Sequence, residues 1–280
     1  MSLLYKTRGL LTRLVNHLHQ SIFGRDMGPT MKDFLRHLSW SVLGILTSSI
    51  LMFIVNILIG RSLGPNEYGK YNLVSTITNV LIVLMWLGVD TTLSKYVSES
   101  DDREEKNSLL SNALIILCTT SVVVGIIVLL LKQKIAGILE TNSSLILLSL
   151  IFAIIAAFRY QLDNFFKARK KFQFQSTMRV LESVLILVSV ILLVFVFKSQ
   201  TYIYFILVLS ATAFVIAFLF LLKVRKRLRG WNQETFNQTK KYLTFAFGGA
   251  MAYVVVGNID KFFVSGFMGT QENWFEIKYF

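Results

Sequence analysis

The sequence predicts an all-α polytopic membrane protein with about seven transmembrane helices and a cytoplasmic N-terminus. Three observations lead to this fold class. Apolar residues make up 54% of the 280 residues and charged residues only 16%, against roughly 25% charged residues in soluble domains. The apolar residues form runs that are long enough to cross a bilayer. The basic residues gather in every second connection between those runs.

The apolar runs give the predicted spans. A helix that crosses the hydrocarbon core needs about 20 apolar residues, because each residue adds roughly 1.5 Å. Seven stretches nearly free of charged residues meet this need, at 37–60, 71–89, 107–131, 141–158, 180–197, 199–222 and 242–259. The two prolines lie outside these stretches, so unbroken helices are permitted.

The distribution of basic residues sets the orientation. Of the 29 Lys and Arg residues, 22 lie in the N-terminal segment or in the second-to-third, fourth-to-fifth and sixth-to-seventh connections. The alternate connections hold only five. Cytoplasmic connections carry the excess of Lys and Arg, so the N-terminus is predicted to be cytoplasmic.

This pattern divides the chain into four parts. Residues 1–36 form a cytoplasmic segment in which leucines recur at helical spacing between basic residues, as in an amphipathic helix that binds membrane lipids. Residues 37–222 form a six-helix lobe, and residues 223–241 a basic cytoplasmic linker. Residues 242–280 begin with the first helix of a second lobe.

The chain shows no signature of an enzyme, a cofactor site or a metal site. The net charge of +13 does not indicate nucleic-acid binding, because the basic residues lie in short segments between spans. The three histidines lack ligand spacing, and no phosphate-binding loop occurs. The single cysteine, Cys118, is expected to be a buried apolar residue.

Ionisable residues near span ends are the candidate substrate-binding residues, because charge is costly in hydrocarbon and tends to face a cavity or a partner. One interpretation is that they anchor helix ends or form local ion pairs, such as Arg159 with Asp163 or Arg179 with Glu182. The other is a cationic cavity for an acidic or phosphorylated substrate. The candidates are Arg61, Asp90, Lys95, Arg159, Asp163 and Asp260.

The connection between the first two spans has a distinct turn composition. Gly64 and Gly69 permit tight or positive-φ backbone, and Pro65 is expected to stop the first helix. Tyr68 and Tyr71 suit the membrane interface. We therefore expect a structural turn at this point.

These residues, Gly-Arg-Ser-Leu-Gly-Pro-Asn-Glu-Tyr-Gly-Lys-Tyr-Asn at 60–72, resemble the L-G-P-x-E-Y-G-x-Y turn of the polysaccharide flippase family. That family belongs to the multidrug/oligosaccharidyl-lipid/polysaccharide exporter superfamily. Three further segments are similar to family motifs in the same order: 87–96, 166–172 and 258–261. The resemblance covers most of residues 40–270.

The resemblance implies one lobe of a two-lobed transporter. Residues 265–272 are similar to the end of the first span, as expected for parallel repeats. Since complete family members carry both lobes, the chain is expected to be an N-terminal lobe with a truncated second lobe. The implied activity is flipping of a polyprenyl-phosphate-linked glycan across the cytoplasmic membrane by alternating access.

Two alternatives remain open. One is a cation-coupled multidrug exporter of the same superfamily, which would favour acidic cavity residues. The other is a non-transporting fragment, or a half-transporter that pairs with a second lobe or with another copy of itself.

The orientation leads to a labelling prediction. In a Cys118→Ser background, single cysteines near residues 168 and 227 should react with a membrane-impermeant maleimide only after the cells are opened. Labelling of either position in intact cells would contradict the seven-span orientation.

Overall fold

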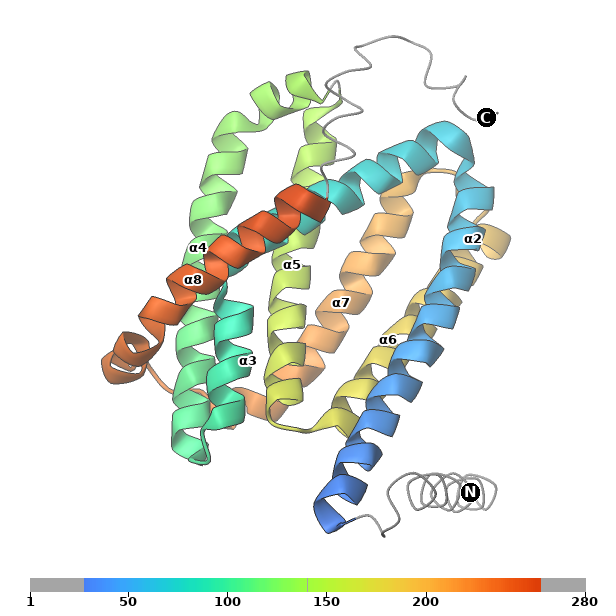
Figure 1. The fold of residues 1–280 in the computed structure, drawn as a ribbon. Helices are drawn as coiled ribbons and strands as arrows, with labels where there is room; N and C mark the ends of the chain where they lie inside the picture. The colour runs from blue at the N-terminus through green and yellow to red at the C-terminus, as the bar shows by residue number, and fades with distance from the viewer. Residues whose placement is uncertain (1–27, 140, 258–280) are drawn as a thin grey trace.

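The long apolar runs form long helices. The computed structural model describes residues 28–139 and 141–257, and these residues contain helices and connections but no strand (Figure 1). The α-helices are α2 (Pro29–Trp86), α3 (Val89–Glu99), α4 (Arg103–Ile138), α5 (Ser143–Ala168), α6 (Phe172–Ile191), α7 (Tyr202–Val224) and α8 (Gln233–Gly257). A π-helical turn (Leu192–Val196) extends α6, and a 3₁₀ turn (Arg225–Arg227) follows α7.

Six of the predicted spans lie in five helices that are long and apolar enough to cross a membrane: α2, α4, α5, α6 with its π-helical extension, and α7. Helix α2 holds both the first and the second predicted span. Its 58 residues would measure about 87 Å if straight, against a hydrocarbon core of about 30 Å. The predicted seventh span, 242–259, falls in α8 as far as residue 257, and α8 is not among the five.

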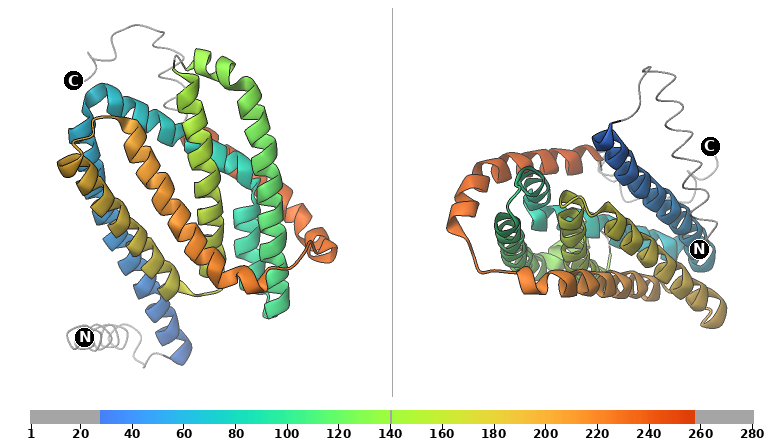
Figure 2. Two further views of the ribbon diagram at one scale, coloured as in Figure 1. Left: turned by 180° about the vertical axis from the view of Figure 1, so that it is seen from behind. Right: turned by 90° about the horizontal axis from the view of Figure 1, so that it is seen from below.

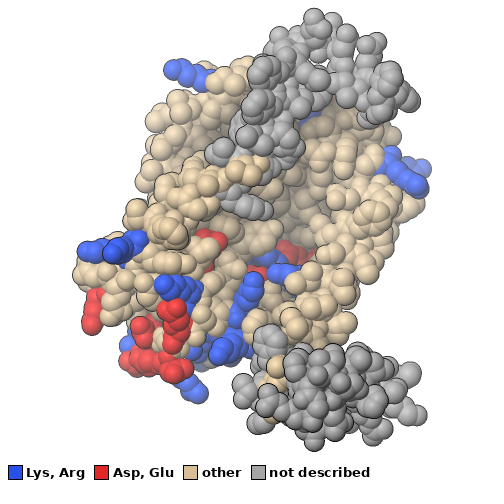
Figure 3. Space-filling model, viewed as in Figure 1, with Lys and Arg blue, Asp and Glu red and all other residues tan. Residues whose placement is uncertain are grey.

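The helices run alternately toward opposite ends of the bundle (Figure 1). The start of α2 and the connections α3–α4, α5–α6 and α7–α8 share one end. These are the connections that carry the basic residues, and the lower part of the space-filling view is rich in charged atoms (Figure 3). The arrangement therefore matches the alternation of charge along the sequence.

The outer surface of the bundle is apolar. Phe53, Leu130 and Phe197 are 67%, 79% and 71% exposed. In the apolar 18-residue stretch of α2, and likewise in that of α4, only 22% of the residues are buried. Soluble monomers rarely expose such continuous apolar surface. The chain is an all-α polytopic membrane protein. Cys118 also lies on the exposed face of α4, so its expected burial is wrong.

Helix α5 is the central helix of the bundle. It packs against α2, α3, α4, α6 and α7, and the view from below shows it between α8 on one side and α7 on the other (Figure 2). Phe165 and Phe166 near its end are fully buried, and Phe166 stacks on Phe220 of α7 with a centroid separation of 5.1 Å. Side chains on α5 are therefore surrounded by protein on most sides.

The predicted turn is a kink within α2. Gly64 has φ 70° and ψ 175°, and Pro65 follows it, while the flanking residues stay helical. Gly64 thus supplies the positive φ that was expected. The same expectation for Gly69 is wrong, because Gly69 is helical. Tyr68 and Tyr71 stack with centroids 6.0 Å apart.

The kink is tied to the start of α7. One Glu67 carboxylate oxygen accepts the Tyr202 backbone N–H at 3.1 Å, and the other accepts Lys70 Nζ at 2.6 Å. A carboxylate at a helix N-terminus satisfies a free N–H and interacts favourably with the helix dipole. Ser62 donates to the Ser199 carbonyl at 2.9 Å. The glutamate of the sequence motif therefore serves as a cap for α7.

Gly88 marks a second break, between α2 and α3. Its φ is 78°, and α8 crosses here so closely that an added Cβ would lie 2.5 Å from the Phe247 backbone nitrogen. Both the positive φ and the close approach require glycine.

The connection to α8 is fixed to α4. Asn232 N donates to Asn112 Oδ1 at 2.9 Å, and Asn112 Nδ2 donates back to the Asn232 carbonyl at 2.8 Å. Arg229 N donates to Ser111 Oγ at 2.8 Å. Since α8 begins at Gln233, residues 233–241 of the expected linker are helical.

Several expectations concern residues outside those described: the amphipathic segment as far as residue 27, Asp260, and the repeat at 265–272. For the labelling experiment, Lys170 is the better position, because it is exposed whereas Ala168 is buried.

Gly88→Ala should destabilise the protein. A non-glycine residue in left-handed backbone costs about 1–3 kcal/mol, and the clash with α8 adds to that cost. We expect a lower apparent melting temperature of the detergent-solubilised protein, measured by fluorescence-detected gel filtration after heating. Gly125→Ala is the control, because Gly125 is helical and its Cβ would meet nothing within 4 Å. Equal melting temperatures for the two variants would contradict the close α2–α8 crossing.

Candidate functional site

Four charged side chains gather between α5 and α6. Arg159 Nη2 is paired with Glu182 Oε2, and Arg179 Nη2 lies 3.4 Å from Asp163 Oδ2. Gln175 Nε2 also donates to Asp163 Oδ2, at 3.0 Å. Two positive and two negative groups thus neutralise one another inside the bundle.

The pairing joins the two helices and does not follow the sequence-local pairs. One of the two interpretations of the sequence paired Arg159 with Asp163 on α5 and Arg179 with Glu182 on α6. The structure exchanges the partners, so each ion pair bridges α5 and α6.

The cluster is largely removed from solvent. Arg159 and Asp163 are each 4% exposed, and Arg159 Nε and Asp163 Oδ1 have no hydrogen-bond partner among the described residues. A single charge at the centre of a bilayer costs about 2.5–3.5 kcal/mol or more. Breaking either pair would therefore leave an uncompensated charge in an apolar setting.

A cavity of about 390 Å³ opens beside the cluster. Its walls come from α5, α6, α7 and both arms of α2, the first arm preceding the Gly64 kink and the second following it. The α2 residues that line the cavity are mostly small and polar. In the space-filling view, charged atoms are visible in the recessed centre of this face (Figure 3). The polar lining residues are Ser48, Ser49, Ser75, Thr78, Asn79, Arg159, Tyr160, Arg179, Glu182 and Ser183.

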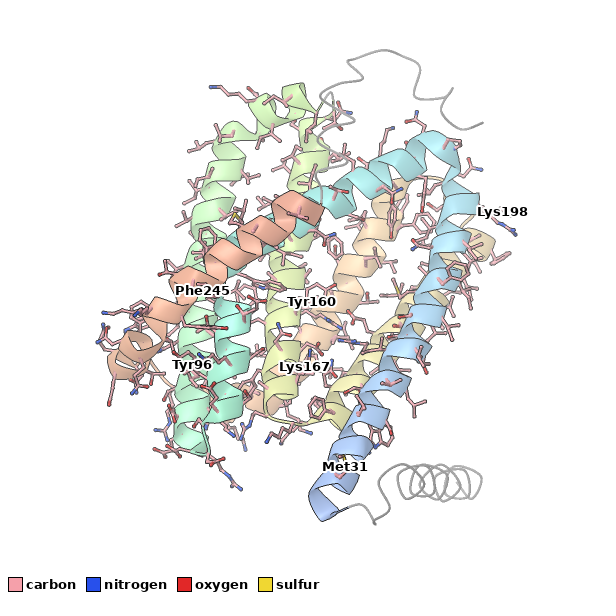
Figure 4. All side chains as sticks on the ribbon, in the orientation of Figure 1. Met31, Tyr96, Tyr160, Lys167, Lys198 and Phe245 are labelled. Atoms are coloured by element: carbon pink, nitrogen blue, oxygen red, sulfur yellow. The ribbon has the colours of Figure 1, made fainter. Side chains whose placement is uncertain are left out.

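An aromatic pair lies at the edge of the charged cluster. Tyr160 is 43% exposed and lies at the centre of the bundle, whereas Lys167 lies nearer the end of α5 (Figure 4). Trp86 meets the Tyr160 ring edge to face, with centroids 6.1 Å apart. The Trp86 indole N–H donates to the Ala157 carbonyl at 3.3 Å, which fixes the indole against α5.

Arg61 does not join this cavity. It is exposed on the first arm of α2 and borders a separate, shallow concavity of about 440 Å³ on one side of the kink. Asn56, Gly64, Pro65 and Tyr68 share that concavity.

Lys95 and Asp90 lie on α3, away from the cavity. Lys95 Nζ is 4.2 Å from the Tyr242 ring centroid and 5.3 Å from that of Tyr96, so it contributes to the contact between α3 and α8. Asp90 is half-buried in the first turn of α3. Of the six candidates, the structure brings together Arg159 and Asp163, while Asp260 lies outside the described residues.

Several cavity residues were missed at the sequence level. Ser75, Thr78, Asn79 and Ile82 recur at helical spacing along the second arm of α2, and this spacing could have indicated one polar face. Nothing in the sequence singled out Tyr160. Among the described residues, no three His, Cys, Asp or Glu side chains group closely enough to hold a metal ion.

The sequence pattern of the family described as "Polysaccharide biosynthesis protein" matches residues 34–272, which is most of the chain. The chain belongs to this family. No curated protein sequence matches the chain significantly.

Solved transporters share the fold of this family member. A MOP superfamily transporter from Pyrococcus furiosus, described as having a binding pocket of reverse polarity, is 12% identical with a TM-score of 0.62, over 81% of this chain and 54% of that chain. An outward-facing multidrug resistance MATE family transporter is 15% identical with a TM-score of 0.62, over 85% and 55%. A MATE transporter in complex with MaD3S is 14% identical with a TM-score of 0.64, over 85% and 57%.

The chain thus spans about half the length of the transporters that it resembles. At these identities the likeness concerns the fold. The family member has the helical arrangement of about half of such a transporter, and the charged cavity lies inside that arrangement.

The ion pairs lead to a stability prediction for this family member. Arg159→Gln alone should cost up to about 3–5 kcal/mol, because it leaves Glu182, whose side chain is only 14% exposed, without a counter-charge. The double variant Arg159→Gln/Glu182→Gln should recover most of that loss. The measurement is the unfolding midpoint in detergent.

The matched control is Arg229→Gln. Arg229 is paired with Glu104 at 2.8 Å, but both side chains are more than half exposed, so the cost should stay within about 1 kcal/mol. If Arg159→Gln/Glu182→Gln were as unstable as Arg159→Gln alone, Arg159 and Glu182 would not be energetically coupled.

Proposed function

We propose that this polysaccharide biosynthesis family member is one lobe of a transporter that moves a glycan on a polyprenyl phosphate carrier across the cytoplasmic membrane. The observation that carries the proposal is the cavity between membrane-spanning helices, with Arg159 and Arg179 in its wall. Family membership supports a polysaccharide-related substrate.

The chemistry of the lining suits such a substrate. Arginine offers a planar set of donors that matches phosphate oxygens in a bidentate manner. The hydroxyl and amide groups of α2 can hydrogen-bond sugar hydroxyls. The lipid tail stays in the bilayer beside the apolar outer surface, so only the polar head group enters the cavity.

The carboxylates keep the empty site neutral. With Glu182 and Asp163 paired to the arginines, the cluster has no net charge before the substrate arrives. An anionic head group then competes with the carboxylates for the arginines. Binding is thereby selective for groups that bind arginine at least as well as a carboxylate does.

Transport by alternating access requires a second lobe. We propose that a second set of helices, from a longer chain or from another copy, closes the cavity on the side opposite to α5. The cavity then opens alternately to the two sides of the membrane.

A cation-coupled multidrug exporter is the second candidate. It is favoured by the two carboxylates, of which Asp163 has one oxygen without a partner among the described residues. In that case Glu182 and Asp163 would bind the cation, and removal of the arginines would not abolish transport.

The test is reconstitution of the 280-residue chain in liposomes with a fluorescent lipid-linked sugar, with the oligomeric mass determined in detergent. We expect flipping by a dimer and none by a monomer. Arg159→Gln/Glu182→Gln should lower the rate at least about tenfold, because it removes an arginine while keeping the site neutral.

Arg229→Gln, at the surface, should retain the wild-type rate. Flipping by a confirmed monomer would contradict the need for a second lobe. Unchanged flipping by Arg159→Gln/Glu182→Gln would contradict the role of the charged cavity in transport.

A further inference from the structure

Tyr160 is unusual among the residues around it. Its neighbours Arg159 and Gln161 are 4% and 0% exposed, yet Tyr160 is 43% exposed. It lines the cavity beside the charged cluster. The ring therefore presents surface to the cavity from a helix that is otherwise packed on most sides.

The ring is held in place by its neighbours. The Arg159 guanidinium carbon lies 4.7 Å from the ring centroid, over one face. Trp86 contacts the ring at an interplanar angle of 83°. Because the residue is 43% exposed and lines the cavity, part of its surface can contact a ligand there.

Anchoring at the membrane interface does not explain this tyrosine. Interfacial tyrosines lie near helix ends, whereas Tyr160 lies eight residues before the end of α5, roughly 12 Å along the axis. Its neighbour Arg159 belongs to the buried charged cluster, and Tyr160 itself lines the cavity. Filling of the core does not explain it either, because nearly half of the residue is exposed.

We infer that Tyr160 is a stacking platform for a sugar ring, next to the arginines that bind its phosphate. The face of an aromatic ring carries partial negative charge and attracts the weakly positive C–H groups of a pyranose face. Ser75 and Asn79 of α2, in the same cavity, supply hydrogen-bonding groups for sugar hydroxyls. In a glycan on a phosphate carrier the first sugar is bonded to the phosphate, so one ligand reaches both subsites.

This inference rests on the proposed function, and the experiment separates the two. The probes are a short-chain polyprenyl diphosphate carrying one hexose and the same diphosphate without the hexose. Binding to the full chain in nanodiscs is followed by the fluorescence of Trp86, in a background where Trp40, Trp231 and Trp274 are replaced by Phe.

Tyr160→Leu should weaken binding of the hexose-bearing probe roughly threefold to tenfold and leave the bare diphosphate unchanged. Leucine fills much of the space, so the fold is retained. Tyr160→Phe keeps the ring and should bind both probes as the wild type does. Tyr204→Leu is the control, because Tyr204 is exposed on α7 and does not line the cavity.

Equal effects of Tyr160→Leu on both probes, or no effect on either, would overturn the sugar subsite while leaving the diphosphate site intact. Failure of the wild type to bind either probe would overturn the proposed function and the sugar subsite with it. Tighter binding of an aromatic cation than of the hexose-bearing probe would assign the platform to a drug-like ligand.

Discussion

Lipid offers no hydrogen bonds and little screening of charge, so a charged side chain within the bundle needs its counter-charge inside the protein. Arg159 and Asp163 on α5 meet this need through Glu182 and Arg179 on α6. The two ion pairs fix the relative position of the two helices. They also place both arginines at the wall of the cavity, where a ligand can reach them.

The same solvent constrains the backbone, because a chain in lipid can leave the helix only where protein or water satisfies its polar groups. Gly64 and Gly88 allow the two breaks at which the chain changes direction. The first break is tied to α7 through Glu67, and the second is covered by α8. Each departure from helical geometry is thus supported by a neighbouring helix.

The docking of α8 has a consequence for transport. Three contacts hold α8 and its connection against the lobe. Helix α8 crosses closely at Gly88, and Lys95 of α3 makes a cation–π contact with Tyr242 of α8. The paired amides of Asn112 and Asn232 fix the connection to α4. In the described residues, α8 therefore packs with the six-helix lobe. Movement of a second lobe relative to the cavity would have to occur around these contacts.

The sequence by itself determined the class of the protein, the places of six apolar spans and the connections that share one end of the bundle. These depend on composition and on local runs of residues, because apolar length and the charge of connections act along the chain. It also pointed to Gly64, and it brought Arg159 and Asp163 forward as candidates. Only the tertiary structure decided that their partners lie on α6, that Lys95 packs against α8, and that Tyr160 opens into the cavity. Those outcomes depend on which helix faces are opposed, since rotating a helix redirects every side chain while the sequence stays the same.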